Sequence, residues 1–397
     1  MLNGYKYKFN DMFSNFAYYN PVKILFGKGQ ISVLPKQIPA DARILLTYGG
    51  GSIFKNGVYD QVIKALKGYT IIEFGGIEAN PYFETLMKAV ELGRSEKVDF
   101  ILAVGGGSVL DGSKFIAAAI PFEGGDEWTN IVLNKTKYSK ALALGSVLTL
   151  PATGSEMNPV AVISKMDTHE KRGMSNPLLF PKFSVLDPET TFSLPEKQVA
   201  NGLADAFTHV MEQYLTYPVN AEIQDRFAES IMKTLIETAP KTIQNPEDYE
   251  SRANFMWAAT VALNGWINLG TPTDWATHQI GHELTAFHGI DHARTLAVVL
   301  PHLLSFKKED KKGKLIQYAR RVWDLSGSDD ELAEAAIQKT IEFYETLGLP
   351  TRASHYGIDQ ESILKIKDRF AKRGMKFGEH ADIGPDEVEK ILQMSIA

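Results

Sequence analysis

The chain has 397 residues, of which 44% are hydrophobic and 23% are charged. This balance is typical of a globular protein of two or three domains and excludes a disordered chain, a collagen or a coiled coil. Lys and Arg total 42 against 48 for Asp and Glu, and a net charge of -6 does not favour a nucleic-acid or membrane-surface binder. Because there is no cysteine, any metal must be held by His, Asp or Glu.

No segment reads as a targeting or membrane sequence. The first 20 residues are polar and aromatic and lack the apolar core of a signal peptide. The longest uncharged stretch, Ala253–Thr273, contains three Asn, two Gly and one Pro. It predicts a buried helix with its exit loop rather than a membrane span, and we therefore expect a cytoplasmic protein.

The first half of the chain alternates short apolar runs with glycine clusters. Helical patterns such as Tyr82–Lys97 lie between the runs, and this succession predicts a parallel α/β sheet. The three clearest runs, each followed by glycines, are Arg43–Tyr48, Thr70–Phe74 and Phe100–Val104.

The second half of the chain is helical in pattern. From Ser193 onward the strand signals disappear, and apolar residues four apart predict helices over Ile223–Thr238 and Leu332–Leu347. We therefore expect an α/β domain over residues 1–192 and an all-helical domain over residues 193–397.

Two loops of sequence Gly-Gly-Gly-Ser are candidates for binding a dinucleotide. Gly49–Ser52 follows the first apolar run and has no acidic residue before Asp60. NAD-selective sites usually place a carboxylate against the ribose 2′-hydroxyl, so small residues with Ser52 weakly favour NADP(H). A simple tight turn is the alternative.

The second loop, Gly105–Ser108, is the clearer anion site. It follows an apolar run and opens a helical pattern, so glycine amides and a helix N-terminus would face a phosphate. It matches neither the usual dinucleotide fingerprint nor a P-loop, and a tight strand-to-helix turn is again the alternative.

Histidines and one aspartate at helical spacing indicate a metal site. Asp205 and His209 are four residues apart, as are His278 and His282, and His292 follows a sharp turn. Residues four apart share one face of a helix. One carboxylate with imidazoles suits Fe²⁺ or Zn²⁺. Spacing alone does not separate His282 from His278 or His292 as ligands.

Together these motifs resemble the iron-containing (group III) alcohol dehydrogenase family over nearly the whole chain. Within that family the chain is most similar to the NADPH-dependent butanol dehydrogenase and aldehyde reductase branch. The resemblance rests on short motifs spread along the chain, and its densest part begins at Leu186–Pro188. The motifs are Pro21–Gly27, the segments TYGGGS, FGGIEANP and AVGGGSVLDGSKF, then Leu186–Pro188 with Pro195, Ala200, Gly202, Asp205 and Glu212, and finally Gly281-His282 to Asp291-His292.

The resemblance implies a Rossmann-like domain followed by a helical metal-binding domain, as in the dehydroquinate synthase-like architecture. It implies the metal ligands Asp205, His209, His278 and His292, and places His282 beside the nicotinamide as the expected catalytic residue. It also implies a homodimer. The expected cofactor-binding residues are Gly50, Ser52, Asn80, Gly105, Gly106, Gly107, Ser108, Asp111, Thr149 and Lys171.

The function expected from these observations is metal-dependent hydride transfer between NADP(H) and primary alcohols or aldehydes. Two alternatives remain open at this point: a metal-dependent lyase or cyclase of the dehydroquinate synthase type, and a non-catalytic metal- or nucleotide-binding protein. Net consumption of NADPH distinguishes the first alternative, and turnover of any aldehyde by metal-loaded protein distinguishes the second.

Overall fold

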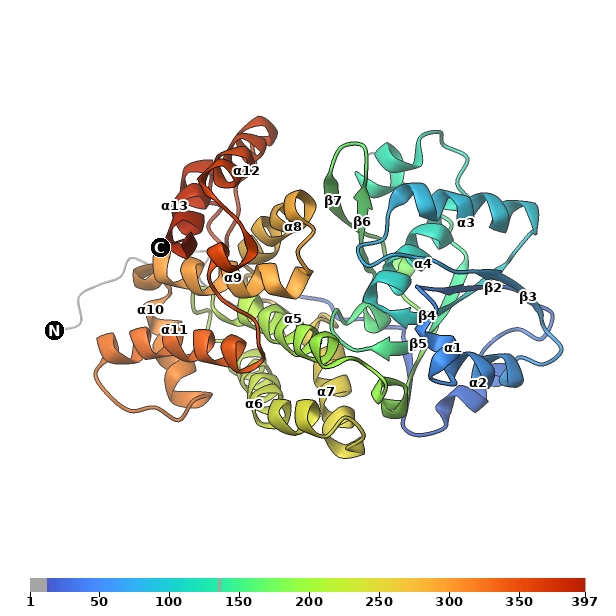
Figure 1. Ribbon diagram of the computed structural model, residues 1–397, viewed down its shortest axis with the longest axis horizontal. Coiled ribbons are helices and arrows are strands. Elements are labelled where there is room, and N and C mark those ends of the chain that lie inside the picture. The colour runs from blue at the N-terminus through green and yellow to red at the C-terminus, as the bar shows by residue number, and fades with distance from the viewer. Residues whose placement is uncertain (1–12, 135–136, 397) are drawn as a thin grey trace. The chain divides into compact units, whose positions relative to one another are not determined.

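A computed structural model describes residues 13–134 and 137–396 of the chain (Figure 1). The described residues form two compact units. One contains residues 19–206 and 238–264, and the other contains residues 13–18, 207–237 and 265–396. The division falls inside two helices, α5 (Glu196–Tyr214) and α6 (Glu222–Gln244).

The first unit is built on a six-stranded, wholly parallel sheet with the strand order β1-β8-β5-β4-β2-β3. The runs expected at Arg43–Tyr48 and Thr70–Phe74 are strands with those bounds, and the third continues from Phe100 to Gly106. The α/β fold class expected from the sequence is thus confirmed. The strands are β1 (Lys23–Phe26), β2 (Arg43–Tyr48), β3 (Thr70–Phe74), β4 (Phe100–Gly106), β5 (Ala143–Leu150) and β8 (Phe183–Leu186).

Helices cover both faces of the sheet (Figure 1). Alternating side chains of the strands pack against the helices of one face or the other. Leu45 and Ile101 pack with α3 (Phe83–Ser95) and α4 (Gly107–Ala119). Their neighbours Ile44 and Leu102 point to the opposite face. That face is covered by the short helices η1 (Gln30–Lys36), α1 (Ser52–Lys55) and α2 (Val58–Ala65).

Three further features complete this unit. An antiparallel hairpin, β6 (Val160–Lys165) with β7 (Glu170–Ser175), follows the sheet's fifth strand and contacts α4. Helix α7 (Tyr249–Ala262) packs Met256 against Leu148 and Leu186. The remaining short helices are η2 (Trp128–Val132), η3 (Ser155–Met157), η4 (Pro177–Leu179) and η5 (Pro188–Thr191).

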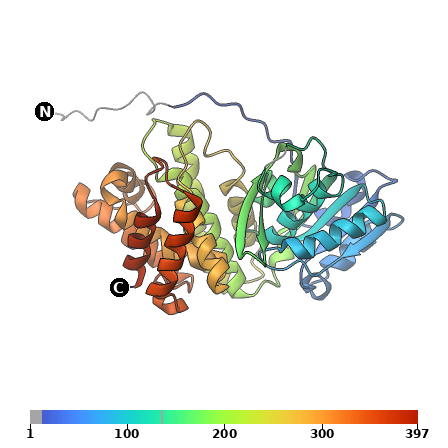
Figure 2. The same cartoon turned by 90° about the horizontal axis from the view of Figure 1, so that it is seen from above.

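The second unit is helical, and its core forms where α8, α9, α12 and α13 meet. Figures 1 and 2 both show α12 and α13 side by side. In the described part of the chain no helix is both long and apolar enough to cross a membrane. Besides α5 and α6, the elements are α8 (Ala276–His288), α9 (His292–Phe306), α10 (Lys308–Arg321), α11 (Asp329–Thr346), η6 (Ala353–Tyr356), α12 (Gln360–Arg373) and α13 (Pro385–Ile396).

The helical second half expected from periodicity is present, with α6 and α11 over the segments named for it. The compact units differ from the expected halves, because α7 and the end of α6 group with the sheet. The boundary near Phe192 therefore stays a prediction.

Candidate functional site

Helix α5 carries two polar side chains into an apolar interior. Its residues Leu203, Phe207 and Met211 are fully buried, and Asp205 and His209, one turn apart, are each only 4% exposed. A carboxylate and an imidazole are costly to bury without polar or metal partners. Their placement on one face of a buried helix is therefore evidence for a site rather than a surface pair.

Three donors from three helices converge there. Asp205 from α5, His278 from α8 and His292 from the start of α9 each offer one ligand atom, and these atoms lie within 4.8 Å of one another. The ring of His209 stacks on that of His278 with 4.6 Å between the ring centres. His282 lies outside the group of three, with its ring centre 5.0 Å from that of His292.

This donor set fits one divalent transition-metal ion. Metal bonds to imidazole nitrogen and carboxylate oxygen are about 2.0–2.2 Å long, so two ligand atoms of one ion lie at most about 4.4 Å apart. The three donor atoms, all within 4.8 Å of one another, are close to that limit, and small side-chain rotations would let them share an ion. A carboxylate with imidazoles is a ligand type that iron and zinc both accept. The ring of Trp275, the residue before α8, meets His278 edge-on with 5.4 Å between ring centres.

A second carboxylate, Glu212, lies against the metal group. It is on the same face of α5 as His209, is 2% exposed, and contacts ring Nδ1 of His278. Burial, with the negative charge of Asp274, raises the pKa of Glu212 well above its usual value. Glu212 is among the residues that carry the family resemblance, but the resemblance implied no role for it. Its spacing of three residues from His209 and seven from Asp205 is the local signal that places it on their face of the helix.

The expected phosphate loop lies between β4 and α4. The strand ends at Gly106 and the helix begins at Gly107, so glycine amides stand at a helix N-terminus. Side chains would not fit here: a Cβ built on Gly105 would lie 2.6 Å from Val109 Cγ2, and one on Gly106 would lie 3.0 Å from Leu150 Cβ.

Three expected cofactor residues form one hydrogen-bonded group near this loop. The hydroxyl oxygen of Ser108 accepts from the Asn80 amide at 3.2 Å, and the Asn80 side-chain oxygen accepts from Lys171 Nζ at 2.8 Å. Burial lowers the pKa of Lys171 to about 8, although the charges of Asp205 and Asp111 oppose this. The group connects the β4–α4 loop with the β6–β7 hairpin.

Thr149 occupies a bulge beside the same loop. Gly105 of β4 pairs with Leu148 of β5, and Gly106 pairs with Leu150, so Thr149 has no partner residue on β4. A bulge of this kind redirects a side chain and is frequent next to active sites. No motif in the sequence indicated this bulge.

The carboxylate of Asp111 is buried and hydrogen-bonded to groups of the protein itself. Its carboxylate accepts from the Ser155 hydroxyl at 2.6 Å and from the Val162 amide at 2.9 Å. Burial raises its pKa, and the nearby Lys114 opposes that shift. These bonds attach α4 to the η3 turn and the hairpin, and a contact of Asp111 with a cofactor stays a prediction.

The Gly49–Ser52 loop directly follows β2, which ends at Tyr48. Gly51 has φ of 92°, in the left-handed region that favours glycine, and Ser52 begins α1. A Cβ built on Gly50 would meet no atom within 4 Å. The loop therefore has open space at Gly50.

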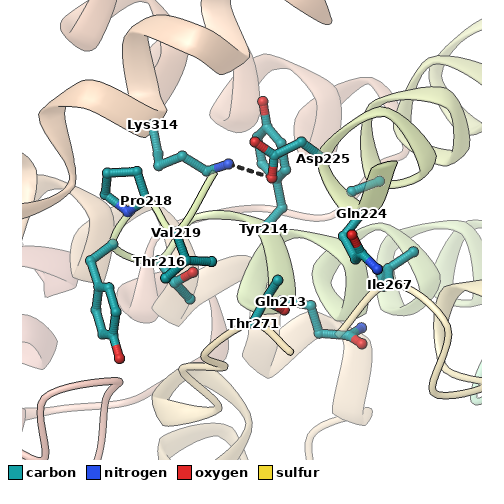
Figure 3. Close-up of a pocket in the computed structure, with 12 residues that line it drawn as sticks. Gln213, Tyr214, Thr216, Pro218, Val219, Gln224, Asp225, Ile267, Thr271 and Lys314 are labelled. Carbon is teal, nitrogen blue, oxygen red and sulfur yellow. Dashed lines mark hydrogen bonds and ion pairs between the residues drawn. The ribbon is translucent and has the colours of Figure 1, made fainter. Parts of the chain in front are cut away.

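A separate pocket lies in the helical unit beyond the C-terminal end of α5 (Figure 3). It is lined by both polar and apolar side chains, and Lys314 Nζ donates to Asp225 at 2.7 Å. None of the expected site residues lines it. We therefore place the candidate site at the histidine group and not at this pocket.

Comparison with known proteins extends over almost the entire chain. Residues 21–188 match the model of the family described as iron-containing alcohol dehydrogenase, and residues 199–396 match that of the Fe-containing alcohol dehydrogenase family, C-terminal. The chain is 55% identical to the NADPH-dependent aldehyde reductase YqhD of Escherichia coli, covering 96% of this chain and 99% of the relative. It is 42% identical to the probable NADH-dependent butanol dehydrogenase 1 of Bacillus subtilis, covering 96% and 100%.

Solved structures agree with the sequence matches. The crystal structure of Escherichia coli YqhD superposes with a TM-score of 0.94 at 54% identity, covering 96% of this chain and 99% of that one. The NADH-dependent butanol dehydrogenase A of Thermotoga maritima superposes with a TM-score of 0.92 at 36% identity, covering 97% and 100%. Sequence and fold therefore agree over both halves of the chain.

Proposed function

This chain belongs to the iron-containing alcohol dehydrogenase family and is an oxidoreductase, and from that premise we propose that it reduces aldehydes to primary alcohols with NADPH at one divalent metal ion. The observation that carries the proposal is the convergence of Asp205, His278 and His292 within 4.8 Å. The similarity to an NADPH-dependent aldehyde reductase favours this activity over the lyase or cyclase alternative. The reverse reaction, alcohol oxidation, uses the same groups.

We assign the metal to Asp205, His209, His278 and His292, and leave Fe²⁺ and Zn²⁺ as the two candidates. When bound, the ion supplies a Lewis acid for the aldehyde oxygen, and NADPH supplies the hydride. His209 lies outside the group of three, and its assignment as the fourth ligand rests on its place one helical turn from Asp205 and on its ring centre lying 4.6 Å from that of His278.

The protein's own groups position the reactants and move the proton. The backbone amides at Gly105–Ser108 bind the dinucleotide phosphates at the start of α4, and Asn80, Lys171 and Thr149 surround that loop. His282 is 7% exposed and its ring lies beside His292. It is the group we propose to deliver a proton to the alcohol oxygen as it forms.

Preference for NADPH over NADH is part of the proposal. A 2′-phosphate needs space, which Gly50 provides at the end of β2, and the Gly49–Ser52 loop itself carries no carboxylate to repel it. Relatives named for NADH and for NADPH both occur among the similar proteins. Substitutions in the Gly49–Ser52 loop therefore test whether this chain prefers NADPH or NADH.

The decisive experiment measures oxidation of NADPH and of NADH with butanal, using protein of known metal content. We expect metal-dependent turnover that favours NADPH, and expect Asp205→Asn and His278→Ala to lose bound metal and most turnover. Normal metal content with normal activity in both variants would overturn the ligand assignment. Absence of turnover by fully metal-loaded protein with short, long and aromatic aldehydes would overturn the proposed activity.

A homodimer and a cytoplasmic location belong to the same proposal. The family resemblance is the support for the homodimer. Size-exclusion chromatography with light scattering tests it directly: a mass near twice 44.1 kDa is expected, and a monomer at micromolar concentration would contradict it.

A further inference from the structure

A buried polar network outside the expected ligands begins at Glu212. We propose that Glu212 is the positioning residue of the metal centre, which holds the His278 imidazole by ring Nδ1 so that Nε2 faces the metal. This inference rests on the proposed function, because it assumes that His278 binds the ion.

The contacts of Glu212 with α8 fix both the backbone and the ring of His278. One carboxylate oxygen accepts from the backbone amide of His278 at 3.2 Å, and the other contacts ring Nδ1 of the same residue. His278 lies in the first turn of α8, where the amides have no partners within the helix. A single carboxylate therefore caps the helix and sets the rotation of the ring.

A ring held at Nδ1 has one nitrogen left for a metal. In metal sites, the second ring nitrogen of a ligating histidine usually donates to a carboxylate or carbonyl, which fixes the tautomer and strengthens the ligand. Glu212 is 2% exposed, so water competes little for this contact. We find this arrangement at His278, the ligand nearest to both His209 and His292 by ring contact.

Glu212 is itself held by a rigid segment. The Asp274 amide donates to the Glu212 carbonyl at 2.9 Å, and the Asp274 carboxylate accepts from the Ala276 amide at 2.9 Å. Asp274 is fixed by Lys311 at 2.8 Å, and Lys311 also donates to Glu379 at 2.7 Å and to the Leu215 carbonyl at 2.7 Å. The side chains of Asp274, Lys311 and Glu379 are all less than 5% exposed.

This network joins α5 to α8 through several independent bonds. The polypeptide before α8 is attached to α5 by the Asp274–Glu212 backbone bond and to α10 by Lys311. The start of α8, and His278 with it, therefore has little freedom to rotate away from Glu212. Such fixed geometry is what a metal centre needs from its surroundings.

The test compares metal binding in three variants of the full-length protein. Glu212→Ala removes both contacts, and Glu212→Gln keeps the size of the side chain but loses its charge. Glu229→Gln is the matched control, because Glu229 is also a buried carboxylate of the helical unit (8% exposed) that accepts from Tyr214 and Gln317 and not from an expected ligand. The readouts are the Co²⁺ dissociation constant, measured by competition with a chromophoric chelator, and the absorption spectrum of the bound Co²⁺.

We expect Glu212→Ala to weaken Co²⁺ binding by about 10- to 100-fold, the usual effect of removing such a partner. We also expect an altered Co²⁺ spectrum, which a purely structural role would not produce. Glu229→Gln is expected to keep both the wild-type affinity and the wild-type spectrum. Co²⁺ affinity within twofold of wild type and an unchanged spectrum in Glu212→Ala would overturn the inference.

Thermal unfolding of the metal-free proteins shows whether the alanine variant folds. If it does not, Glu212→Gln decides the question by the same two readouts: weaker binding with a changed spectrum supports positioning by the carboxylate, and unchanged values refute it. If wild-type protein binds Co²⁺ but reduces no aldehyde, the proposed activity is contradicted and the positioning role of Glu212 is not. Wild-type protein that binds no ion would remove both.

Discussion

Gly107 and Thr153 approach each other too closely for a side chain at position 107. A Cβ built on Gly107 would lie 2.4 Å from Oγ1 of Thr153. The Thr153 hydroxyl in turn accepts from the Ser155 amide at 3.2 Å, a hydrogen bond that would be lost if the side chain moved aside. The glycine at the first residue of α4 is therefore required by packing of the loop after β5 against the start of that helix.

This contact leads to the first prediction, for Gly107→Ala. The added methyl group must push the β5 loop away from α4, and overpacking of this kind costs about 1–3 kcal/mol. If the loop holds the dinucleotide phosphates, the NADPH dissociation constant should rise roughly 5- to 150-fold, as measured by fluorescence titration. The bound metal content should stay at the wild-type value.

Gly313→Ala is the control for that variant. Gly313 is exposed within α10, and a Cβ there meets no atom within 4 Å. Alanine at this position should stabilise the helix by about 0.5–1 kcal/mol and leave NADPH affinity unchanged. NADPH affinity of Gly107→Ala equal to that of Gly313→Ala would mean that the β4–α4 loop is only a tight turn.

The second prediction concerns cofactor choice at Gly50. Since a Cβ at Gly50 meets no atom within 4 Å and its φ lies outside the left-handed region, Gly50→Asp adds a charge without a clash. Repulsion between the new carboxylate and a 2′-phosphate should lower the ratio of kcat/KM for NADPH to that for NADH by about tenfold or more, equivalent to at least about 1.4 kcal/mol. Steady-state kinetics with both cofactors measures this ratio.

Gly50→Asn separates charge from size in that experiment, because Asn has the shape of Asp without its charge. We expect the asparagine variant to keep most of the preference for NADPH. An equal loss in both variants would point to a steric effect, and no change in either would show that the loop does not face the ribose.

The parts of the fold that the sequence predicts best are those with strong local signals. The strands Arg43–Tyr48 and Thr70–Phe74 have the expected bounds, because an apolar run ended by glycines marks a buried parallel strand. The β6–β7 hairpin and the four-residue edge strand β1 were not singled out as strands. β1 has only four residues, and the charged residues Glu170, Lys171 and Arg172 at the start of β7 leave no apolar run that would mark a strand.

The site was predictable as a set of residue types and not as a geometry. Helical spacing pairs Asp205 with His209 and His278 with His282, but it does not say which faces of three helices meet. That depends on the packing of α5, α8 and α9, which brings His292 rather than His282 into the group with Asp205. Glu212 and His278 lie 66 residues apart in the sequence and on different helices. For the same reason, no local sequence pattern predicts their contact.

The third prediction is a pH dependence that originates at Lys114. This side chain is fully buried in α4 and donates to Ser155 at 2.7 Å and to the Val160 carbonyl at 2.7 Å. Burial lowers the pKa of Lys114 to about 8, although the charges of Asp111 and Glu156 oppose the shift. Between this value and the unfolded value of 10.5, the native state binds fewer protons than the unfolded state.

A native state that binds fewer protons is stabilised as the pH rises. The contribution of Lys114 to the free energy of unfolding should therefore increase from pH 8 to pH 10.5, by about 3 kcal/mol in total at roughly 1.4 kcal/mol per pKa unit. Denaturant unfolding of wild type and Lys114→Met at both ends of this range gives the difference, in which the other titrating groups cancel. A constant difference across the range would contradict the lowered pKa.

The fourth prediction concerns the cluster of Lys311 with Asp274 and Glu379. Burial disfavours the Lys311 ammonium, but the two carboxylates outweigh burial and raise its pKa, so the side chain stays charged. Lys311→Met leaves two carboxylates less than 5% exposed without their counter-charge. Removing one partner from a buried ion pair typically costs about 3–5 kcal/mol.

Calorimetry should therefore show a markedly lower Tm for Lys311→Met. The control is Lys308→Met on the same helix, because Lys308 pairs with Glu334 at 3.0 Å where both side chains are exposed. Exposed pairs contribute at most about 1 kcal/mol, so its Tm should stay close to that of wild type. Equal Tm changes in the two variants would mean that the buried cluster adds no more than a surface pair, and would also weaken its assignment as the support of Glu212.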